Sequence, residues 1–258
     1  MFRIMMMTFS LIAAILVDIA ANIVPFNGIT TGEIANRLPV LFMPSGYVYA
    51  IWAVIYILLI VWLYGFWQDT KNSNHSLQNG RAALFISSSL LNIAWILFWH
   101  YGVFYWTIVI ATALLFTLLA MYFTYPQRNT QLFGRLAIGV YLGWIFILTI
   151  TNISYVLTFH EWSGWGLSDP LWTVIYLTIA TAIALHFLYH HADIALNVVF
   201  MWTFVGIAVR NGADELFVSV AALFLTAAIG ASIVITQKAQ MSIQRRQVSN
   251  SHQDSKSF

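Results

Sequence analysis

The sequence contains no cysteine, and charged residues make up only 8% of its 258 positions. Without cysteine the chain forms no disulfide and offers no thiolate nucleophile or Cys-ligated metal site. Soluble domains carry roughly 25% charged residues, so a chain this poor in charge is not typical of a soluble domain. Its net charge of +2 at pH 7 is too small to indicate a nucleic-acid partner. No nucleotide-binding loop, Ser/His/Asp pattern or paired-carboxylate pattern is visible, so we assign no catalytic residues and do not expect an enzyme.

Long hydrophobic runs fill most of the chain, and hydrophobic residues account for 60% of it. Each run has about 17–24 residues, the length at which an α-helix crosses a bilayer. We therefore predict an all-α fold, a polytopic membrane helical bundle of about eight transmembrane helices whose surroundings are the lipid bilayer. The predicted spans are residues 4–24, 46–67, 83–101, 104–125, 136–158, 170–189, 193–209 and 215–236, followed by a polar tail at 237–258 that we expect to be disordered.

Lysine and arginine are distributed unequally between the two ends of these spans. One side carries Arg3, Lys71, Arg81, Arg128, Arg135, Lys238, Arg245, Arg246 and Lys256, and the other carries Arg37 and Arg210. Basic loops are retained on the cytoplasmic side, so we predict that both termini are cytoplasmic, in the plasma membrane of a bacterium. The first run resembles a cleaved signal peptide, but its length and Asp18 favour a retained helix.

Four polar side chains lie inside predicted spans, where burial in lipid is costly and such groups usually face the protein interior. They are Asp18, Asn22, Asn92 and Asn152. At a rise of about 1.5 Å per residue, they lie with Trp52, Tyr56 and Trp95 in the outer half of the membrane. Hydrogen bonds between helices, worth about 0.6–2 kcal/mol each, would explain the asparagines. Asp18 is either a proton- or cation-binding group or a protonated carboxyl bonded to Asn22.

The tryptophans divide into two groups by their depth along the spans, and two of the histidines share a helix face. The tryptophans near span ends, which we predict to form an interfacial belt, are Trp62, Trp67, Trp99, Trp106, Trp162, Trp165 and Trp172. Trp144 and Trp202 lie deeper, like Trp52 and Trp95, and either pack in the core or offer flat faces to a ligand. His186 and His190 share a helix face, but the one acid nearby is Asp193, so we predict no metal site.

Two local patterns bear on the organisation of the chain. The segment between the first two spans contains Thr30-x-x-Glu33, which is typical of a capping box and predicts either a short helix at about residues 31–37 or a plain turn. In addition, IWAVIY at 51–56 is similar to LWTVIY at 171–176. The second pattern indicates either a duplication of four spans plus four or a chance match.

Three segments carry spaced motifs that resemble those of one family of membrane proteins. Pro44, Trp52 and Tyr56 resemble PP-x6/7-W-x3-Y, and LNIAWILFW at 91–99 resembles LN-x2-W-x3-F with Trp99 in place of the Phe. RLAIGVYLGWIFILTITN at 135–152 resembles R-x5-YL-x-W-x7-N. Over residues 39–158 this order and spacing is similar to the TspO/MBR family, the tryptophan-rich sensory proteins and translocator proteins. The chain departs from that pattern at Leu41 and Val140 and adds about three helices after residue 160.

The resemblance implies a TspO-like five-helix core at 1–160, three additional transmembrane helices at 161–236 and a cytoplasmic tail at 237–258. Members of the family bind tetrapyrroles such as porphyrins, and some bind sterols or benzodiazepine-like compounds, in a pocket beneath the first loop. The resemblance implies no required cofactor, and porphyrin breakdown is an activity that has been proposed for the family. We also expect that the chain can form a homodimer. The ligand-binding residues that we expect are Asp18, Asn22, Pro44, Tyr49, Trp52, Tyr56, Asn92, Trp95, Tyr141, Trp144 and Asn152.

Three functions therefore stay open at the level of sequence. The first is a sensor or translocator for a flat hydrophobic ligand such as a tetrapyrrole, with the loop at 25–45 as a lid. The second is a proton- or cation-coupled secondary transporter of a small solute that uses Asp18. The third is a structural membrane protein whose asparagines and tryptophans only pack helices together.

Overall fold

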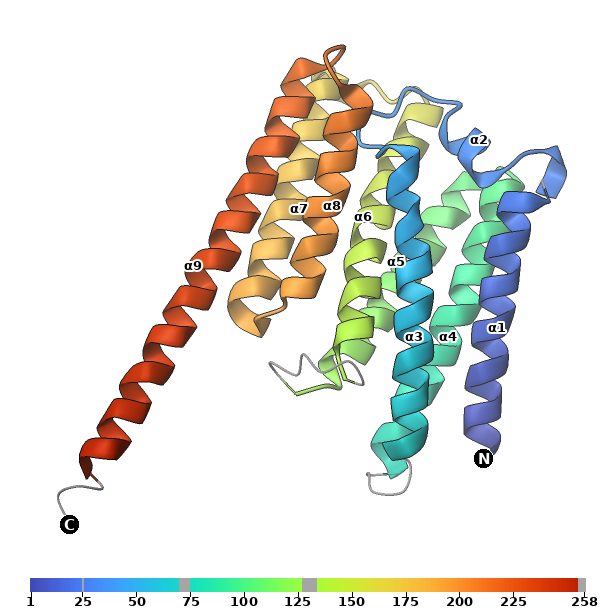
Figure 1. Cartoon of the computed structure of the whole chain (residues 1–258). Helices are drawn as coiled ribbons and strands as arrows, with labels where there is room; N and C mark the ends of the chain where they lie inside the picture. The colour runs from blue at the N-terminus through green and yellow to red at the C-terminus, as the bar shows by residue number, and fades with distance from the viewer. Residues whose placement is uncertain (25, 70–74, 127–133, 255–258) are drawn as a thin grey trace.

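The computed structural model describes residues 1–24, 26–69, 75–126 and 134–254 (Figure 1). In these residues eight helices are long and apolar enough to cross a membrane and no strand occurs, which confirms the predicted polytopic bundle. A helix satisfies its own backbone hydrogen bonds, which lipid cannot do. The elements are α1 (Phe2–Ile23), η1 (Phe26–Gly28), α2 (Thr31–Ala35), η2 (Gly46–Ala50), α3 (Ile51–Asp69), α4 (His75–His100), α5 (Phe104–Phe123), α6 (Leu136–Phe159), η3 (Gly164–Gly166), α7 (Asp169–His191), α8 (Ile194–Asn211) and α9 (Leu216–Asp254).

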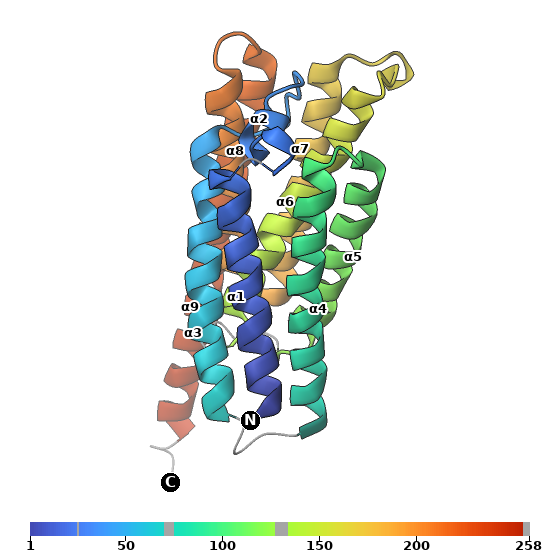
Figure 2. The ribbon, with the colours of Figure 1, turned by 90° about the vertical axis from the view of Figure 1, so that its right-hand side faces the viewer.

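Helix α6 lies at the centre of the bundle. It packs against α5 and α3 on one side and against α8 on the other, and it is the most buried of the spans. Figures 1 and 2 show α1, α3, α4 and α5 grouped beside it and α7, α8 and α9 forming a second group. The N-terminus and the C-terminal part of α9 lie at one end, while α2 crosses the other, which we call the α2 end (Figure 1).

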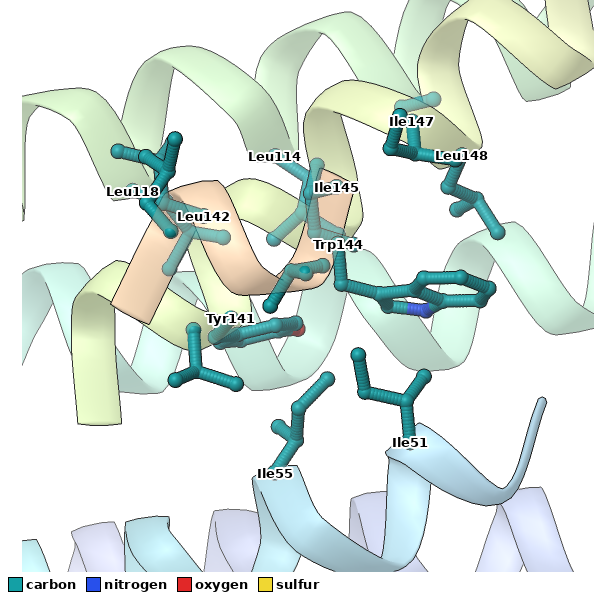
Figure 3. Packing of buried hydrophobic residues seen from close by; sticks show 14 of the residues in the cluster. Ile51, Ile55, Leu114, Leu118, Tyr141, Leu142, Trp144, Ile145, Ile147 and Leu148 are labelled. Carbon is teal, nitrogen blue, oxygen red and sulfur yellow. The ribbon is translucent and has the colours of Figure 1, made fainter. Parts of the chain in front are cut away.

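Small residues allow α6 and α8 to approach closely. Gly139 and Gly143 are four residues apart on α6, and a Cβ at these positions would lie 2.9 Å from Asp193 Oδ2 and 3.3 Å from the Leu196 side chain, respectively. Membrane helices associate through such small-residue faces because lipid offers no hydrophobic driving force between them. On a different face of α6, Tyr141 and Trp144 point toward α3 (Figure 3).

Two helices extend beyond their predicted spans. α4 begins at His75 rather than at 83, and Arg3 of α1 donates to Gln78 and Asn79 in its first turns, at 2.7 and 2.6 Å. α9 continues to Asp254, so residues 237–254 are helical rather than disordered as predicted. This stretch has no glycine or proline to end the helix. Lys71, Arg128, Lys256 and the tail beyond Asp254 lie outside the described residues.

Three tryptophans depart from their predicted positions. Trp62, predicted at the interface, is fully buried, donates to the Tyr125 hydroxyl at 2.7 Å and stacks on Phe85. Trp99 is also buried. Trp202, predicted to pack in the core or to face a ligand, is 42% exposed. Depth along a helix is set by sequence position, but burial depends on which face of the helix meets its neighbours.

Candidate functional site

The short helix α2 lies over one end of the bundle and is held by its own capping box. The Thr30 hydroxyl accepts a hydrogen bond from the Glu33 backbone N–H, and the Glu33 carboxylate accepts from the Thr30 N–H at 2.7 Å. The capping box confirms the short helix, which ends at Ala35. The Thr30 N–H and the Thr30 hydroxyl both donate to the Glu33 carboxylate and hold the pKa of this carboxyl below its ordinary value, because they favour its charged form.

A cavity of about 330 Å³, which we call the α2 cavity, lies beneath this helix. Its walls come from α1, α3, α4, α6, α8 and the segment that leads into α3. Helices distant in sequence therefore meet at this place. The predicted site residues that line the cavity are Asp18, Asn22, Pro44, Tyr49, Trp52, Trp95 and Asn152.

The other four predicted residues lie next to the lining rather than in it. Tyr56 stacks on Trp52, with ring centroids 5.6 Å apart, and the Asn92 amide contacts the Tyr56 hydroxyl at 3.5 Å. The Tyr141 and Trp144 rings lie 6.0 and 6.1 Å from the Trp52 ring, in edge-on geometry. Together these side chains form an aromatic layer that fixes Trp52 at the cavity wall.

For Asp18 the structure does not show the alternative in which its carboxyl bonds Asn22. The Asn22 amide donates to the backbone carbonyl of Asp18 at 2.8 Å, so it does not bond the carboxyl. A side chain four residues along the helix reaches that carbonyl readily. The Tyr56 hydroxyl lies near the Asp18 carboxyl. Within the described part of the chain no Lys, Arg or His forms an ion pair with Asp18.

Buried N–H groups around the cavity are not all paired. The Trp95 indole donates to the Asn152 carbonyl oxygen at 3.4 Å. Asn152 Nδ2 and the Trp99 indole N–H are buried and have no partner among the described residues. An unpaired buried donor costs about 1–3 kcal/mol, so an acceptor supplied by a ligand or a water molecule would stabilise both.

The structure adds lining residues that sequence reasoning missed. Arg210, at the end of α8, lines the cavity and donates to the Asn36 carbonyl oxygen at 2.9 Å. The signal in the sequence is that Arg210 is a basic residue on the side that is nearly free of positive charge. The remaining additions are Thr31, Gly32, Ala35, Asn36, Met43, Gly46, Ile96, Trp99, Leu148 and Thr151.

The histidines of α7 do not gather around a metal site in the structure. Asp193, the acid nearest to them, lies 3.7 Å from Arg135 Nε and accepts a hydrogen bond from the Tyr122 hydroxyl at 2.8 Å. Among the described residues no group of three or more His, Cys, Asp or Glu side chains is placed to hold a metal ion.

The comparisons with known proteins give one match. The family model described as TSPO-like protein matches residues 4–235, a range that reaches from the first span into the eighth and so covers most of the three helices after residue 160. No curated protein and no solved structure matches the chain.

Proposed function

The chain belongs to the TSPO-like family, and from that premise we propose that it is a sensor or translocator that binds a tetrapyrrole such as a porphyrin in the α2 cavity. One observation carries the proposal: side chains from four membrane helices, Asp18, Trp52, Trp95 and Asn152, line a single cavity. Its volume of about 330 Å³ falls in the range of small-molecule sites, about 300–1,000 Å³.

The chemistry of the lining suits a flat conjugated ring with polar substituents. The indole faces of Trp52 and Trp95 offer apolar, polarisable surfaces for stacking. Unpaired donors on Trp99 and Asn152 suit an acceptor atom on the ligand. The Arg210 guanidinium suits a carboxylate, such as a porphyrin propionate. These groups bind and orient a ligand, and we assign none of them a catalytic step.

The first experiment titrates purified protein with protoporphyrin IX and follows tryptophan quenching. We expect saturable binding by the wild-type chain and a loss of about tenfold or more in affinity for the Trp52→Leu/Trp144→Leu variant, because removal of buried aromatic anchors is costly. Trp106→Leu is the matched control, since Trp106 is 56% exposed and lies outside the lining. Circular dichroism and gel filtration would verify folding.

Absence of saturable quenching, or equal affinities for the double variant and the control, would reject a tetrapyrrole in this cavity. If the double variant lost thermal stability while the wild-type protein bound no ligand, the third function, a purely structural role for these side chains, would be favoured.

A second candidate function is proton- or cation-coupled transport through Asp18. The supporting observation is that this carboxyl lines the cavity and forms no ion pair with the described residues. In vesicles with an imposed pH gradient, Asp18→Asn should abolish gradient-driven uptake of the ligand and leave its equilibrium binding intact. If ligand uptake by the wild-type protein did not depend on the pH gradient, proton-coupled transport would be excluded.

With both termini in the cytoplasm of a bacterium, as proposed from the basic residues, the cavity opens to the outside.

A further inference from the structure

A second cavity, which we call the α6–α7 cavity, lies at the same end of the bundle and encloses about 200 Å³. It lies between the last turns of α6, the first turns of α7 and the segment before α3, and shares no lining residue with the α2 cavity. Helix α6 borders both cavities with different faces, since Asn152 lines the first and Ser154 the second. The proposed function does not involve the second cavity.

Two carboxylates line this cavity without a counter-charge. Glu161 follows the end of α6, and Asp169 occupies the first turn of α7. In the described residues neither of them has a Lys, Arg or His nitrogen within 4.0 Å, the distance of an ion pair. No basic residue lines the cavity, so it presents a concentration of negative charge to any molecule that enters.

Aromatic rings form the adjoining wall. Trp162, Trp172 and Tyr176 all line the cavity. The Trp162 and Trp172 rings lie 5.0 Å apart, and the Trp172 indole is fixed by donating to the Gly164 carbonyl at 2.8 Å. An interfacial belt would explain tryptophans here. It would not explain why two carboxylates lie in the same cavity as these rings.

Ser154 adds a polar group that has no explanation in the packing. Its side chain is only 9% exposed and lines the cavity. The Ser154 backbone carbonyl accepts from Thr158, but its hydroxyl has no hydrogen-bond partner among the described residues. Ser154 Oγ is not among the fully shielded unpaired atoms of the described residues, so this hydroxyl is open to the cavity that it lines and is available to a ligand or water there.

From these observations we propose that the α6–α7 cavity binds a small organic cation with an alkylammonium group, such as a trimethylammonium. Aromatic faces attract such cations through their quadrupole, and carboxylates add the Coulomb term. A divalent metal fits less well, because Ca²⁺ requires six to eight oxygen ligands and the carboxylates that line the cavity are only Glu161 and Asp169. The small volume excludes ligands of drug size. The cation could be free in solution or part of a lipid headgroup, since both present the same group.

The test is calorimetric titration of the full-length protein, in a maltoside detergent, with choline and with 3,3-dimethyl-1-butanol, its uncharged isostere. We expect saturable binding of choline alone. Glu161→Gln and Asp169→Asn should each weaken it by about five- to tenfold, because each removes one charge from a partly exposed site. Asp214→Asn is the matched control, an exposed acid at the same end of the bundle that lies outside the cavity. Trp172→Leu should weaken binding without any change of charge.

Three results would overturn the proposal: no saturable choline binding, equal binding of the alcohol, or wild-type affinity in both acid variants. Binding of protoporphyrin IX to the Glu161→Gln variant is measured in parallel and should be unchanged, so the two cavities are tested separately. Titrations in lipid nanodiscs show whether the bound alkylammonium group belongs to a free solute or to a lipid headgroup. Weaker choline binding in phosphatidylcholine than in phosphatidylglycerol discs would indicate a lipid headgroup, and equal binding would indicate a free solute; either supports the site.

Discussion

Asp18 and Arg210 place opposite charges in the lining of one largely apolar cavity, although they lie in the first and seventh spans. Intramembrane acids and bases are costly to keep, so each requires a local explanation. Arg210 has a protein partner in Asn36, which is a neutral amide and leaves the positive charge available. Asp18 lies near the Tyr56 hydroxyl and has no ion-pair partner in the described residues. The two residues therefore differ in role: one suits an anionic substituent of the ligand, the other a proton or cation.

Replacement of Arg210 should show whether this residue recognises the negative charge of the ligand or only the shape of its ring. We expect Arg210→Gln to weaken the binding of protoporphyrin IX by about tenfold, because a charge-assisted hydrogen bond to a propionate is lost. The dimethyl ester of protoporphyrin IX, which lacks the negative charges, should bind the wild-type protein and the Arg210→Gln variant with equal affinity. Arg37→Gln is the control, an exposed arginine of the same region outside the lining. An equal loss for acid and ester would instead indicate that Arg210 acts by holding Asn36 and α2 in place.

At the scale of elements, the segment that enters α3 is seated on α8. The Ser45 N–H donates to the Gly206 carbonyl at 3.1 Å, and the Asn211 amide donates to the Leu41 carbonyl at 2.9 Å. Val48 packs against Gly206 so closely that a Cβ there would collide with its side chain, and Pro44 lies 3.3 Å from the same point. Because Pro44 and Tyr49 line the α2 cavity, the helix α8 controls the position of part of its wall.

Gly206→Ala should therefore disturb the cavity without touching the ligand. The added methyl group displaces Val48 and with it the segment 44–49, at a cost of about 1–3 kcal/mol typical of overpacking. We expect a lower melting temperature and weaker porphyrin binding. Gly230→Ala is the matched control, because its Cβ would meet only the flexible end of Met201, at 3.3 Å. Wild-type binding and stability in Gly206→Ala would contradict the seating of this segment on α8.

At the scale of the whole molecule, α6 joins the two groups of helices. At the end opposite α2, Arg135 and Asp193 form a buried ion pair between α6 and α8, with side chains only 2% and 7% exposed. The Arg135 guanidinium also donates to the His191 carbonyl at 2.6 Å and lies over the Tyr122 ring. The structure thus gives the Arg135 of the fifth-span motif a structural explanation: it connects the helices on either side of residue 160.

Breaking this ion pair should destabilise the bundle. Arg135→Leu leaves the Asp193 carboxylate buried without its counter-charge, which costs about 3–5 kcal/mol in known cases. We expect a clearly lower melting temperature in detergent. The double variant Arg135→Leu/Asp193→Leu should recover part of the loss, because no unpaired charge stays buried. If the double variant lost as much stability as the two single variants together, the two side chains would contribute independently and not as a pair.

The sequence by itself determined that the chain is a helical membrane bundle with eight spans, because hydrophobic run length and the need for internal backbone hydrogen bonds leave few alternatives. It also predicted that Asp18, Trp52, Trp95 and Asn152 lie at a similar depth, since each helical residue adds a fixed rise. Seven of the eleven predicted residues line the α2 cavity.

The tertiary structure decided which face of each helix meets which neighbour. It placed Tyr56, Asn92, Tyr141 and Trp144 next to the lining rather than in it. It also brought Arg210 of α8 into the cavity and gathered Glu161, Asp169 and the neighbouring aromatic rings around a second cavity. The physical reason is that depth follows from position along one helix, whereas rotation about the helix axis and the choice of neighbours follow from the packing of all helices together.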